Sequence, residues 1–301
     1  MNITFRQLRI FDAVARHESI TKAAEELGLT QPAVSMQIQQ LERNVGFPLF
    51  ERHNRRLYLT SSGREVHPYT GQITHDFSNM EAAIKDIKGY TSGSLSVSVA
   101  TTANHFATRL LGAFAKKHEK IKVRLHVTNR AELLKQLESS QPDLVIMGEP
   151  PPHLDLDSNV LMDNALVVIA WRNHPFLKQK AIKLIDLQNQ RFLIREKGSG
   201  TLAAVKRHFN RYNLDLPKSL LELTTNEGIK HAVEAELGLG IVSEHTIELE
   251  LKTNYLKILD VENFPIMRQW YAVTRKGQAL SPIAEKFRAF ALANAKKFAR
   301  F

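Results

Sequence analysis

The sequence contains no cysteine among its 301 residues. Disulfides, cysteine metal ligands and a cysteine nucleophile are therefore excluded, and the absence fits a reducing compartment such as the cytoplasm. Long apolar runs are also absent. The longest near the middle of the chain, Ala165 to Trp171, is far shorter than the roughly 20 residues that span a bilayer. The first residues lack a basic stretch followed by an apolar core, so we expect no signal peptide and no membrane partner.

Positive charge is in excess, with 41 basic and 31 acidic residues and a net charge of +10. Residues 1–90 contribute little to it, because their 11 basic and 10 acidic side chains give a net charge of only +1. Residues 91–301, with 30 and 21, carry a net charge of +9. The total suggests a polyanionic partner, but the case for DNA depends on local pattern.

A helix-turn-helix pattern occupies residues 19–45. Ser19 and Thr30 are residue types that cap helix N-termini, so we expect one helix to begin after each. Gly28 lies between them and supplies the small-residue turn that ends the first helix. Pro32 falls in the first turn of the second helix, where its missing N–H removes no hydrogen bond.

The second of these helices has two chemically different sides. The predicted buried side consists of Val34, Ile38, Leu41 and Val45. The opposite side is a polar row spaced by four residues, Gln31, Ser35, Gln39 and Arg43, flanked by Met36 and Gln40. Short polar side chains let the backbone approach base edges, and glutamine can pair bidentately with adenine. The row alone could be a solvated helix face, but its place after the tight turn favours a recognition helix in the major groove.

Residues 48–60 follow with the sequence PLFERHNRRLYLT. Apolar residues at both ends bracket a polar centre, which predicts a short β-ribbon, or wing. Three arginines on this ribbon would reach phosphates or a narrow minor groove, namely Arg52, Arg55 and Arg56. Such a cluster is usually solvated surface, but its position directly after a recognition-type helix favours contact with the DNA backbone.

Residues 61–90 are predicted to form one long linker helix. Apolar residues recur there at steps of three and four: Val66, Tyr69, Ile73, Phe77, Met80, Ile84 and Ile87. This is the spacing of a coiled-coil seam, although the stripe could instead pack on its own domain. A helix of about 45 Å, at ~1.5 Å per residue, is long for a small headpiece to cover, so we expect a second copy to cover it. The resulting dimer requires an interrupted, near-palindromic operator.

From residue 93 onward, β-rich runs alternate with helical runs. The strand-like runs are 95–100, 122–127, 143–147, 165–171, 191–195, 219–223 and 239–243, and the helical runs are 104–118, 130–139, 200–212 and 226–237. Such alternation predicts parallel sheets with crossover helices. We expect two lobes joined by two chain crossings, the first at about 94–163 and 267–301 and the second at about 164–266.

Polar and glycine residues follow these predicted strands at their carboxyl ends. In open α/β sheets, ligands bind beyond these ends and near helix N-termini. The candidate effector-binding residues are Thr101, Thr102, Thr128, Asn129, Gly148, Glu149, Arg195, Ser199, Gly200, Thr201 and Thr225. Each alone could be a plain helix cap, but their shared placement predicts a site for an anionic, oxygen-rich metabolite.

Residues 5–64 resemble the DNA-binding domain of LysR-type transcriptional regulators. The resemblance is carried by LRIFDAVARHESITKAAEELGLTQPAVSMQIQQLERNVGFPLFER and the closing LTSSG. It implies a winged helix-turn-helix in residues 1–60, with the motif at Thr21–Gln40. Many members have arginine where this chain has Met36, so the resemblance implies thymine-methyl or shape readout there. Together with the pattern above, it gives as candidate DNA-binding residues Thr21, Thr30, Gln31, Pro32, Ser35, Met36, Gln39, Arg52, Arg55 and Arg56.

The rest of the chain resembles the effector domain of the same family, which is similar to periplasmic solute-binding proteins. The resemblance implies a multidomain fold: a mainly α-helical winged helix-turn-helix, a dimerisation helix at 61–90 and a two-lobed α/β effector domain at 91–301. It also implies dimers or tetramers and contact with RNA polymerase. In relatives, the positions of Thr101, Thr102, Gly148 and Thr201 line the inducer cleft, where Gly148 can offer only its backbone.

Four stretches are most similar to the family members that regulate RuBisCO and other Calvin-cycle operons: TTANHFATRLL, IMGEPP, FLIREKGSGT and MRQWYAV. That likeness implies a phosphorylated sugar metabolite or NADPH as effector, with no resident cofactor or metal. Regulation of another metabolic operon stays open. The sequence gives neither the operator nor the choice between activation and repression.

Two other classes of function fit the sequence less well. An enzyme is disfavoured because GxSxG, P-loop, HExxH and GxGxxG motifs are absent, and the 12 histidines form no pair at metal-ligand spacing beside carboxylates. A small-molecule receptor without a DNA role would fit the two lobes but leaves the N-terminal motif unexplained. We therefore predict a cytoplasmic, DNA-binding transcription regulator.

Overall fold

The computed structural model describes residues 2–53, 56–87, 93–138 and 142–298. The chain divides into two compact units, one formed mainly by residues 1–90 and the other by most of residues 91–301. Within the described ranges, no helix combines the length and the hydropathy needed to cross a membrane.

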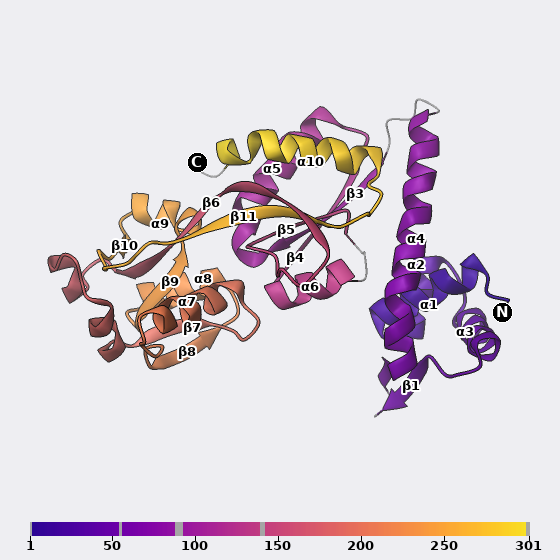
Figure 1. Cartoon of the computed structure of the whole chain (residues 1–301), viewed down its shortest axis with the longest axis horizontal. Coiled ribbons are helices and arrows are strands. Elements are labelled where there is room, and N and C mark those ends of the chain that lie inside the picture. The colour runs from indigo at the N-terminus through magenta and orange to yellow at the C-terminus, as the bar shows by residue number, and fades with distance from the viewer. Residues whose placement is uncertain (1, 54–55, 88–92, 139–141, 299–301) are drawn as a thin grey trace. The chain divides into compact units, whose positions relative to one another are not determined.

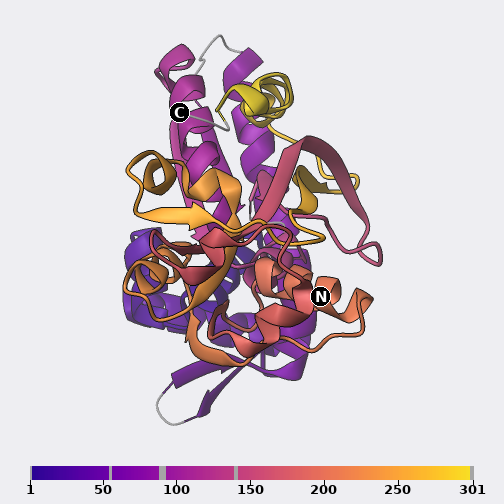
Figure 2. The same cartoon turned by 90° about the vertical axis from the view of Figure 1, so that its left-hand side faces the viewer.

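Three helices and a two-stranded ribbon form the N-terminal headpiece, residues 2–53 and 56–60 (Figure 1). The helices are α1 (Phe5–His17), α2 (Ile20–Leu27) and α3 (Gln31–Val45), and the strands are β1 (Phe50–His53) and β2 (Arg56–Leu59). The two strands pair antiparallel and project away from the helices (Figure 2). The predicted helix-turn-helix and wing are therefore confirmed as structural elements.

The predicted caps account for the tight turn between α2 and α3. Ser19 accepts a hydrogen bond from the N–H of Lys22, and Thr30 accepts one from the N–H of Ala33. Gly28 ends α2 with a φ of 64°, a conformation that costs glycine little because it lacks a Cβ. The turn is thus set by three residues whose backbone or side-chain chemistry favours it.

The headpiece core is shared by all three helices and the ribbon. Phe11, Val34 and Leu49 are fully buried in it, and Leu57 and Leu59 of the wing pack against it. Glu42 of α3 fixes the path into the wing, because its carboxylate accepts the N–H groups of Leu49 and Phe50 at 2.8 and 3.1 Å. The wing is therefore attached both by apolar contact and by a charged hydrogen-bond acceptor.

The linker helix α4 (Ser61–Ile87) begins directly after the wing. A Cβ on Gly63 would overlap the carbonyl oxygen of Leu49, so this close approach requires glycine. Two members of the predicted seam contact the headpiece: Val66 packs against its core, and the ring of Phe77, which is still 36% exposed, lies 4.2 Å from that of Phe5. Others stay exposed, namely Tyr69, Ile73, Met80 and Ile84; the side chain of Ile87 lies outside the described part.

One mixed sheet of nine strands runs through the second unit. Its strands are β3 (Ser94–Ala100), β4 (Lys122–Thr128), β5 (Leu144–Met147), β6 (Leu156–Trp171), β7 (Phe192–Arg195), β8 (Ser219–Leu223), β9 (Leu239–Ser243), β10 (Leu256–Ile258) and β11 (Ile266–Arg275). Their order is β4-β3-β5-β11-β6-β9-β7-β8, with β10 beside β6. The helices are α5 (Asn104–Lys117), α6 (Arg130–Glu138), α7 (Gly200–Arg211), α8 (Asn226–Glu234), α9 (Glu248–Lys252) and α10 (Pro282–Asn294).

The expectation of purely parallel sheets was wrong. β3, β4 and β5 pair parallel, as do β7, β8 and β9, but β6 and β11 run antiparallel to each other and to their outer neighbours. These two long strands run side by side from one lobe to the other and are the predicted crossings (Figure 1). Most of the first half of β6 is exposed and polar, so no apolar run indicated it.

Alternating residues of β6 contribute to two apolar cores of the second lobe, one on each face of the sheet. Leu166 and Val168 face the core that α7 covers, whereas Val167 and Ile169 face the core that α8 covers. Successive strand side chains point to opposite faces of a sheet, so one apolar run can serve two cores. The first lobe places α5 beside α10, with the ring of Phe114 5.1 Å from that of Phe287 (Figure 1).

Candidate functional site

The predicted recognition helix α3 presents its polar row to solvent. Gln31, Pro32, Gln39 and Arg43 are exposed, and Ser35 is half-buried. Met36 is the most exposed apolar residue of the headpiece, with 61% of its surface accessible. Val34, Ile38 and Leu41 are buried on the other side, and Val45 is half-buried. The predicted orientation of the helix is confirmed, and contact with bases stays a prediction.

The glutamine amides of α3 differ in their engagement. Gln40 donates to Asn44 at 3.0 Å and accepts from Arg43 at 2.8 Å, so its amide is held along the helix. Gln31 and Gln39 have no hydrogen-bond partner within the described residues. Their donors and acceptors are therefore available to base edges.

The remaining candidate DNA-binding residues surround α3. Arg52 of β1 and Arg56 of β2 are exposed on the wing, and Arg55 lies outside the described residues. Thr21 is exposed on the first turn of α2. Thr30 is exposed as well, but its hydroxyl already caps α3. The hydroxyl of Thr30 is therefore engaged as the N-cap of α3, and contact of these residues with DNA stays a prediction.

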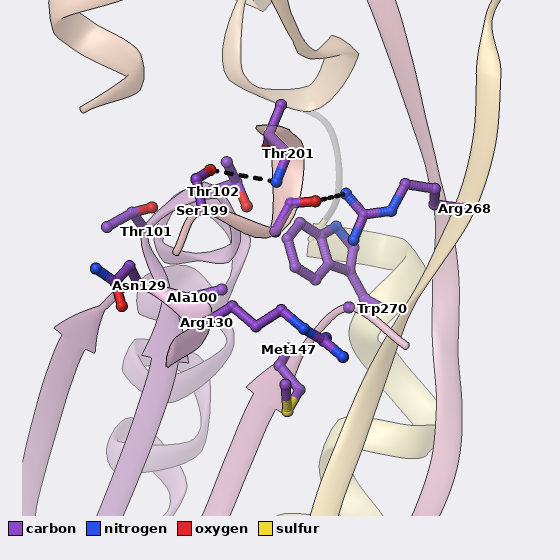
Figure 3. Close-up of a pocket in the computed structure, with 12 residues that line it drawn as sticks. Ala100, Thr101, Thr102, Asn129, Arg130, Met147, Ser199, Thr201, Arg268 and Trp270 are labelled. Carbon is purple, nitrogen blue, oxygen red and sulfur yellow. Dashed lines mark hydrogen bonds between the residues drawn. The ribbon is translucent and has the colours of Figure 1, made fainter. Parts of the chain in front are cut away.

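One cavity lies at the carboxyl ends of β3 and β5, between the two lobes (Figure 3). It is small, about 20 Å³. The structure brings seven of the predicted residues to its wall: Thr101, Thr102, Asn129, Gly148, Ser199, Gly200 and Thr201. Five further residues line it, and the sequence did not single them out: Ala100, Arg130, Met147, Arg268 and Trp270.

Four predicted residues lie outside this wall. Thr128 ends β4, and Thr225 caps α8 through a hydrogen bond from the N–H of Gly228. Glu149 contributes its backbone oxygen, which accepts from Arg130 at 2.6 Å. Arg195 lies behind the cavity. Thr128 and Arg195 are the last residues of their strands, and Glu149 and Thr225 follow strands, so all four lie at strand ends as expected without lining the cavity.

Arg195 is the centre of a buried network. Its side chain is 3% exposed and pairs with Glu196 at 2.8 Å and with Asn226 at 2.7 Å. It also donates to Thr101 Oγ1 at 3.2 Å, which ties the second lobe to the first. The hydroxyl of Thr101 thus accepts from Arg195 and keeps its own proton for another acceptor.

Two guanidinium groups at the cavity, those of Arg130 and Arg268, have no acidic partner in the described part of the chain. Within the described residues, neither Arg130 nor Arg268 has a carboxylate oxygen within 4.0 Å. Burial and the charges of Arg207 and Arg130 lower the pKa of Arg268 to about 10, against a weaker opposing effect of Glu149. Burial and Arg207 also lower the pKa of Arg130. The site therefore holds positive charge that lacks compensation.

The other polar groups of the cavity are mainly hydrogen-bond donors. The indole of Trp270 is 2% exposed, and its Nε1 has no hydrogen-bond partner within the described residues. In the view of Figure 3, Trp270 lies between the guanidinium groups of Arg130 and Arg268. Buried donors are normally satisfied. Together with the hydroxyls of Thr101 and Thr102, these groups match a ligand that is rich in anionic oxygen.

Arg130 could have been found in the sequence, since it directly follows Asn129 at a strand end. Arg268 and Trp270 could not, because β11 returns from the second lobe over 100 residues later and reads as a mixed polar and apolar run. Only its antiparallel pairing with β5 and β6 brings it to this edge of the sheet.

Comparison with known proteins decides the family. Residues 5–64 match the family described as "Bacterial regulatory helix-turn-helix protein, lysR family", and residues 88–296 match "LysR substrate binding domain". The chain belongs to the LysR family. It is a DNA-binding transcription regulator with a helix-turn-helix headpiece and a two-lobed α/β effector domain, as predicted.

Three relatives show the extent of the similarity. The chain is 48% identical to the RuBisCO operon transcriptional regulator of Allochromatium vinosum, over 99% of this chain and 98% of the relative. The regulatory domain of CcmR from Synechocystis PCC6803, solved in complex with 2-PG, is 40% identical and matches with a TM-score of 0.65, covering 67% of this chain and 97% of that one. CbnR, a LysR family regulator, shares the fold at 20% identity and a TM-score of 0.65, covering 99% and 100%.

Proposed function

We propose that this LysR-family regulator controls a RuBisCO operon in response to a small metabolite with at least two negative charges. The single observation that supports the effector class is the pair Arg130 and Arg268, two half-buried guanidinium groups with no carboxylate partner in the described residues. Uncompensated buried charge is costly, and an anionic ligand would remove that cost. The operon is proposed from the 48% identity with the Allochromatium regulator.

The size of the cavity favours a phosphorylated metabolite over NADPH. A cavity of about 20 Å³ holds little more than one water molecule, so it must open to admit any metabolite. Small movements of Arg268 would admit a compound of a few carbon atoms, but a dinucleotide would need the lobes to separate widely. The CcmR domain bound to 2-PG (2-phosphoglycolate) is a relative whose ligand is of the smaller kind.

The proposed DNA-bound form is a dimer or a tetramer. The exposed apolar residues of α4 would pair with those of a second copy, which would place two α3 helices on one near-palindromic operator. Effector binding would change the arrangement of the two lobes, provided that the effector binds one arrangement more tightly than the other. That change would alter the bend of the DNA and the contact with RNA polymerase. Because its target would be operator DNA, this action would take place in the cytoplasm.

Binding to the promoter of a RuBisCO operon tests the proposal. We expect the full chain to protect an interrupted palindrome upstream of the operon from nuclease, to bind it far more tightly than a scrambled duplex, and to lose affinity steeply with salt. Equal affinity for both duplexes at moderate salt would favour the alternative of a small-molecule receptor without a DNA role. Protection of another metabolic promoter alone would favour a different target operon.

A thermal-shift series tests the effector class separately. Ligands that bind only the folded state raise the melting temperature by mass action, so we expect 2-PG and phosphorylated sugars to raise it and their dephosphorylated counterparts to leave it unchanged. A shift with NADPH alone would replace the proposed effector class.

A further inference from the structure

The side chain of Arg268 occupies space that an effector in this cavity would need. It extends from β11, where Arg268 pairs with Asn164 of β6 in one of the two crossings between the lobes. Its guanidinium lies against the Cα of Gly148, and a Cβ on Gly148 would overlap Nη2 of Arg268. Gly148 therefore leaves a notch at the end of β5, the Gly148 notch, and Arg268 fills it.

The contacts that hold Arg268 in the notch are weak for a half-buried cation. Nη1 donates to the backbone oxygen of Gly200 at 3.2 Å, as the dashed line in Figure 3 shows. This acceptor is neutral, whereas a hydrogen bond to an ionised acceptor is shorter and about twice as strong. The positive charge of Arg130 also repels the guanidinium of Arg268 in the notch. A ligand oxygen with negative charge would therefore compete well with Gly200.

Three parts of the effector domain meet at this guanidinium. Gly148 follows β5 of the first lobe, Gly200 begins α7 of the second, and Arg268 itself belongs to the connecting strand β11. If a ligand replaced Gly200 as the hydrogen-bond partner of Arg268, the contact between the connecting strand β11 and the second lobe would be lost. Arg130, which begins α6 in the first lobe, is the second cation available to the same anion.

We propose that Arg268 is a gate for the effector: its guanidinium rests in the Gly148 notch, and a small phosphorylated metabolite binds by drawing it out of the notch into a clamp with Arg130. This inference rests on the anionic effector proposed above and adds the residue that selects it. A ligand with one negative charge compensates one guanidinium group and leaves the other uncompensated. The gate therefore favours ligands with two or more negative charges.

Alanine at position 148 separates a gate from a simple contact. The atom that a new Cβ would meet is the far end of a flexible side chain, and Gly148 has no left-handed φ, so the variant should fold. In Gly148→Ala, the new Cβ would displace Arg268 from the notch before any ligand binds. The ligand would then no longer have to break the contact between Arg268 and the notch. We expect its affinity for 2-PG, measured by isothermal titration calorimetry on the full chain, to rise about three- to tenfold.

A loss of 2-PG affinity in Gly148→Ala, instead of a gain, would overturn the gate proposal. If Gly148 merely provides room for the ligand, Gly148→Ala weakens 2-PG binding, and an unchanged affinity would mean that the notch has no role. Gly112→Ala is the matched control, because Gly112 lies in α5 of the same lobe and its Cβ would meet open space. We expect Gly112→Ala to bind 2-PG as the parent chain does.

Substitution of Arg268 tests the charge requirement. We expect Arg268→Met to weaken 2-PG binding at least tenfold and glycolate binding less than threefold, and Arg268→Lys to fall between. The chain has only two tryptophans, so in a Trp171→Phe background the fluorescence of Trp270 reports binding at the cavity. The melting temperature of each variant shows whether it is folded. Equal losses of affinity for 2-PG and for glycolate would overturn the gate proposal.

The two proposals fail in different ways. If the parent chain binds neither 2-PG nor inorganic phosphate while still binding its operator, the anionic effector is wrong and the gate with it. If the parent chain binds 2-PG but Gly148→Ala weakens that binding, the gate alone is wrong.

Discussion

Asp12 of α1 and His67 of α4 face each other, with 3.4 Å between Asp12 Oδ1 and His67 Nε2. Asp12 is 8% exposed and also pairs with Arg16 at 2.9 Å. Burial would raise the pKa of Asp12, but the interactions with His67 and Arg16 outweigh it and lower that pKa. The linker helix thus places the imidazole of His67 beside the Asp12 carboxylate of the first helix.

Asp12→Asn should therefore destabilise the headpiece. The substitution removes the negative charge that Arg16 and His67 face and leaves polar groups in a buried position, which costs about 1–3 kcal/mol. Urea denaturation followed by circular dichroism would measure the loss in free energy of unfolding. Glu25→Gln, at an exposed position of α2, is the control and should change it little. Equal stability of Asp12→Asn and the control would contradict this account.

Glu26 makes headpiece stability depend on pH in the acidic range. Hydrogen bonds from Arg16 and His17, at 2.7 and 2.6 Å, outweigh partial burial and lower the pKa of Glu26 to about 2. A lowered pKa contributes stability that is complete above the unfolded value near 4.5 and is lost as the pH falls toward 2. Because Glu26 is more than one-third exposed, we expect only about 1 kcal/mol.

Thermal unfolding between pH 7 and pH 2 would show this dependence. The melting temperature of the parent chain should fall more steeply below pH 4.5 than that of Glu26→Gln, whereas the two should differ by a constant amount above pH 5. Parallel curves down to pH 2 would show that the Arg16–Glu26 pair does not stabilise the folded headpiece.

The headpiece could be predicted almost completely from the sequence, because its determinants are local. Thr30, Gly28 and the row beginning at Gln31 act within one or two turns of helix, and the structure places them as that spacing requires. The linker seam was only partly correct. The ring of Phe5, over 70 residues away in sequence, lies 4.2 Å from that of Phe77, and such a tertiary contact leaves no periodic signal.

The effector site was less predictable because its charges come from distant segments. Thr101, Gly148 and Thr201 could be identified since each directly follows a strand or begins a helix. Arg268 arrives on β11, which pairs antiparallel with β5 and β6 and was not identified as a strand. Arg195 was identified, but the sequence could not show that Glu196 and Asn226 pair with its guanidinium, and its contact with an effector stays a prediction.

Gln31→Ala should weaken operator binding without changing the fold. Gln31 is exposed at the start of α3 and has no hydrogen-bond partner in the described residues. Loss of one bidentate contact with a base costs about 1–3 kcal/mol of discrimination. Fluorescence anisotropy with operator and scrambled duplexes would measure it. Gln37→Ala, off the polar row of the same helix, is the control, and equal losses for both variants would place base contact elsewhere.

Ile73→Glu should weaken self-association through α4. Ile73 is 46% exposed in the middle of the apolar stripe, and a pairing helix would force its replacement to bury a charge. Sedimentation equilibrium should show a dimer dissociation constant raised at least tenfold. Ser78→Glu adds the same charge at an exposed polar position of the helix and should associate as the parent chain does. Unchanged association of Ile73→Glu would remove the stripe from the interface.

Arg195→Met should destabilise the effector domain rather than merely weaken ligand binding. The guanidinium is buried and bonded to Glu196, Asn226 and Thr101, so its removal leaves the Glu196 carboxylate without its partner. Breaking a buried pair on one side costs about 3–5 kcal/mol. Arg195→Lys keeps the charge but not the planar fork of donors, so we expect an intermediate loss.

Denaturation of these variants beside Arg191→Met separates the two roles of Arg195. Arg191 is exposed and directly precedes β7, so its loss should cost under about 0.5 kcal/mol. If Arg195→Met unfolded at the same denaturant concentration as Arg191→Met but failed to bind 2-PG, Arg195 would be a ligand contact after all. A large loss of stability in Arg195→Met, with a smaller loss in Arg195→Lys, would instead establish that this residue holds the second lobe to Thr101 of the first.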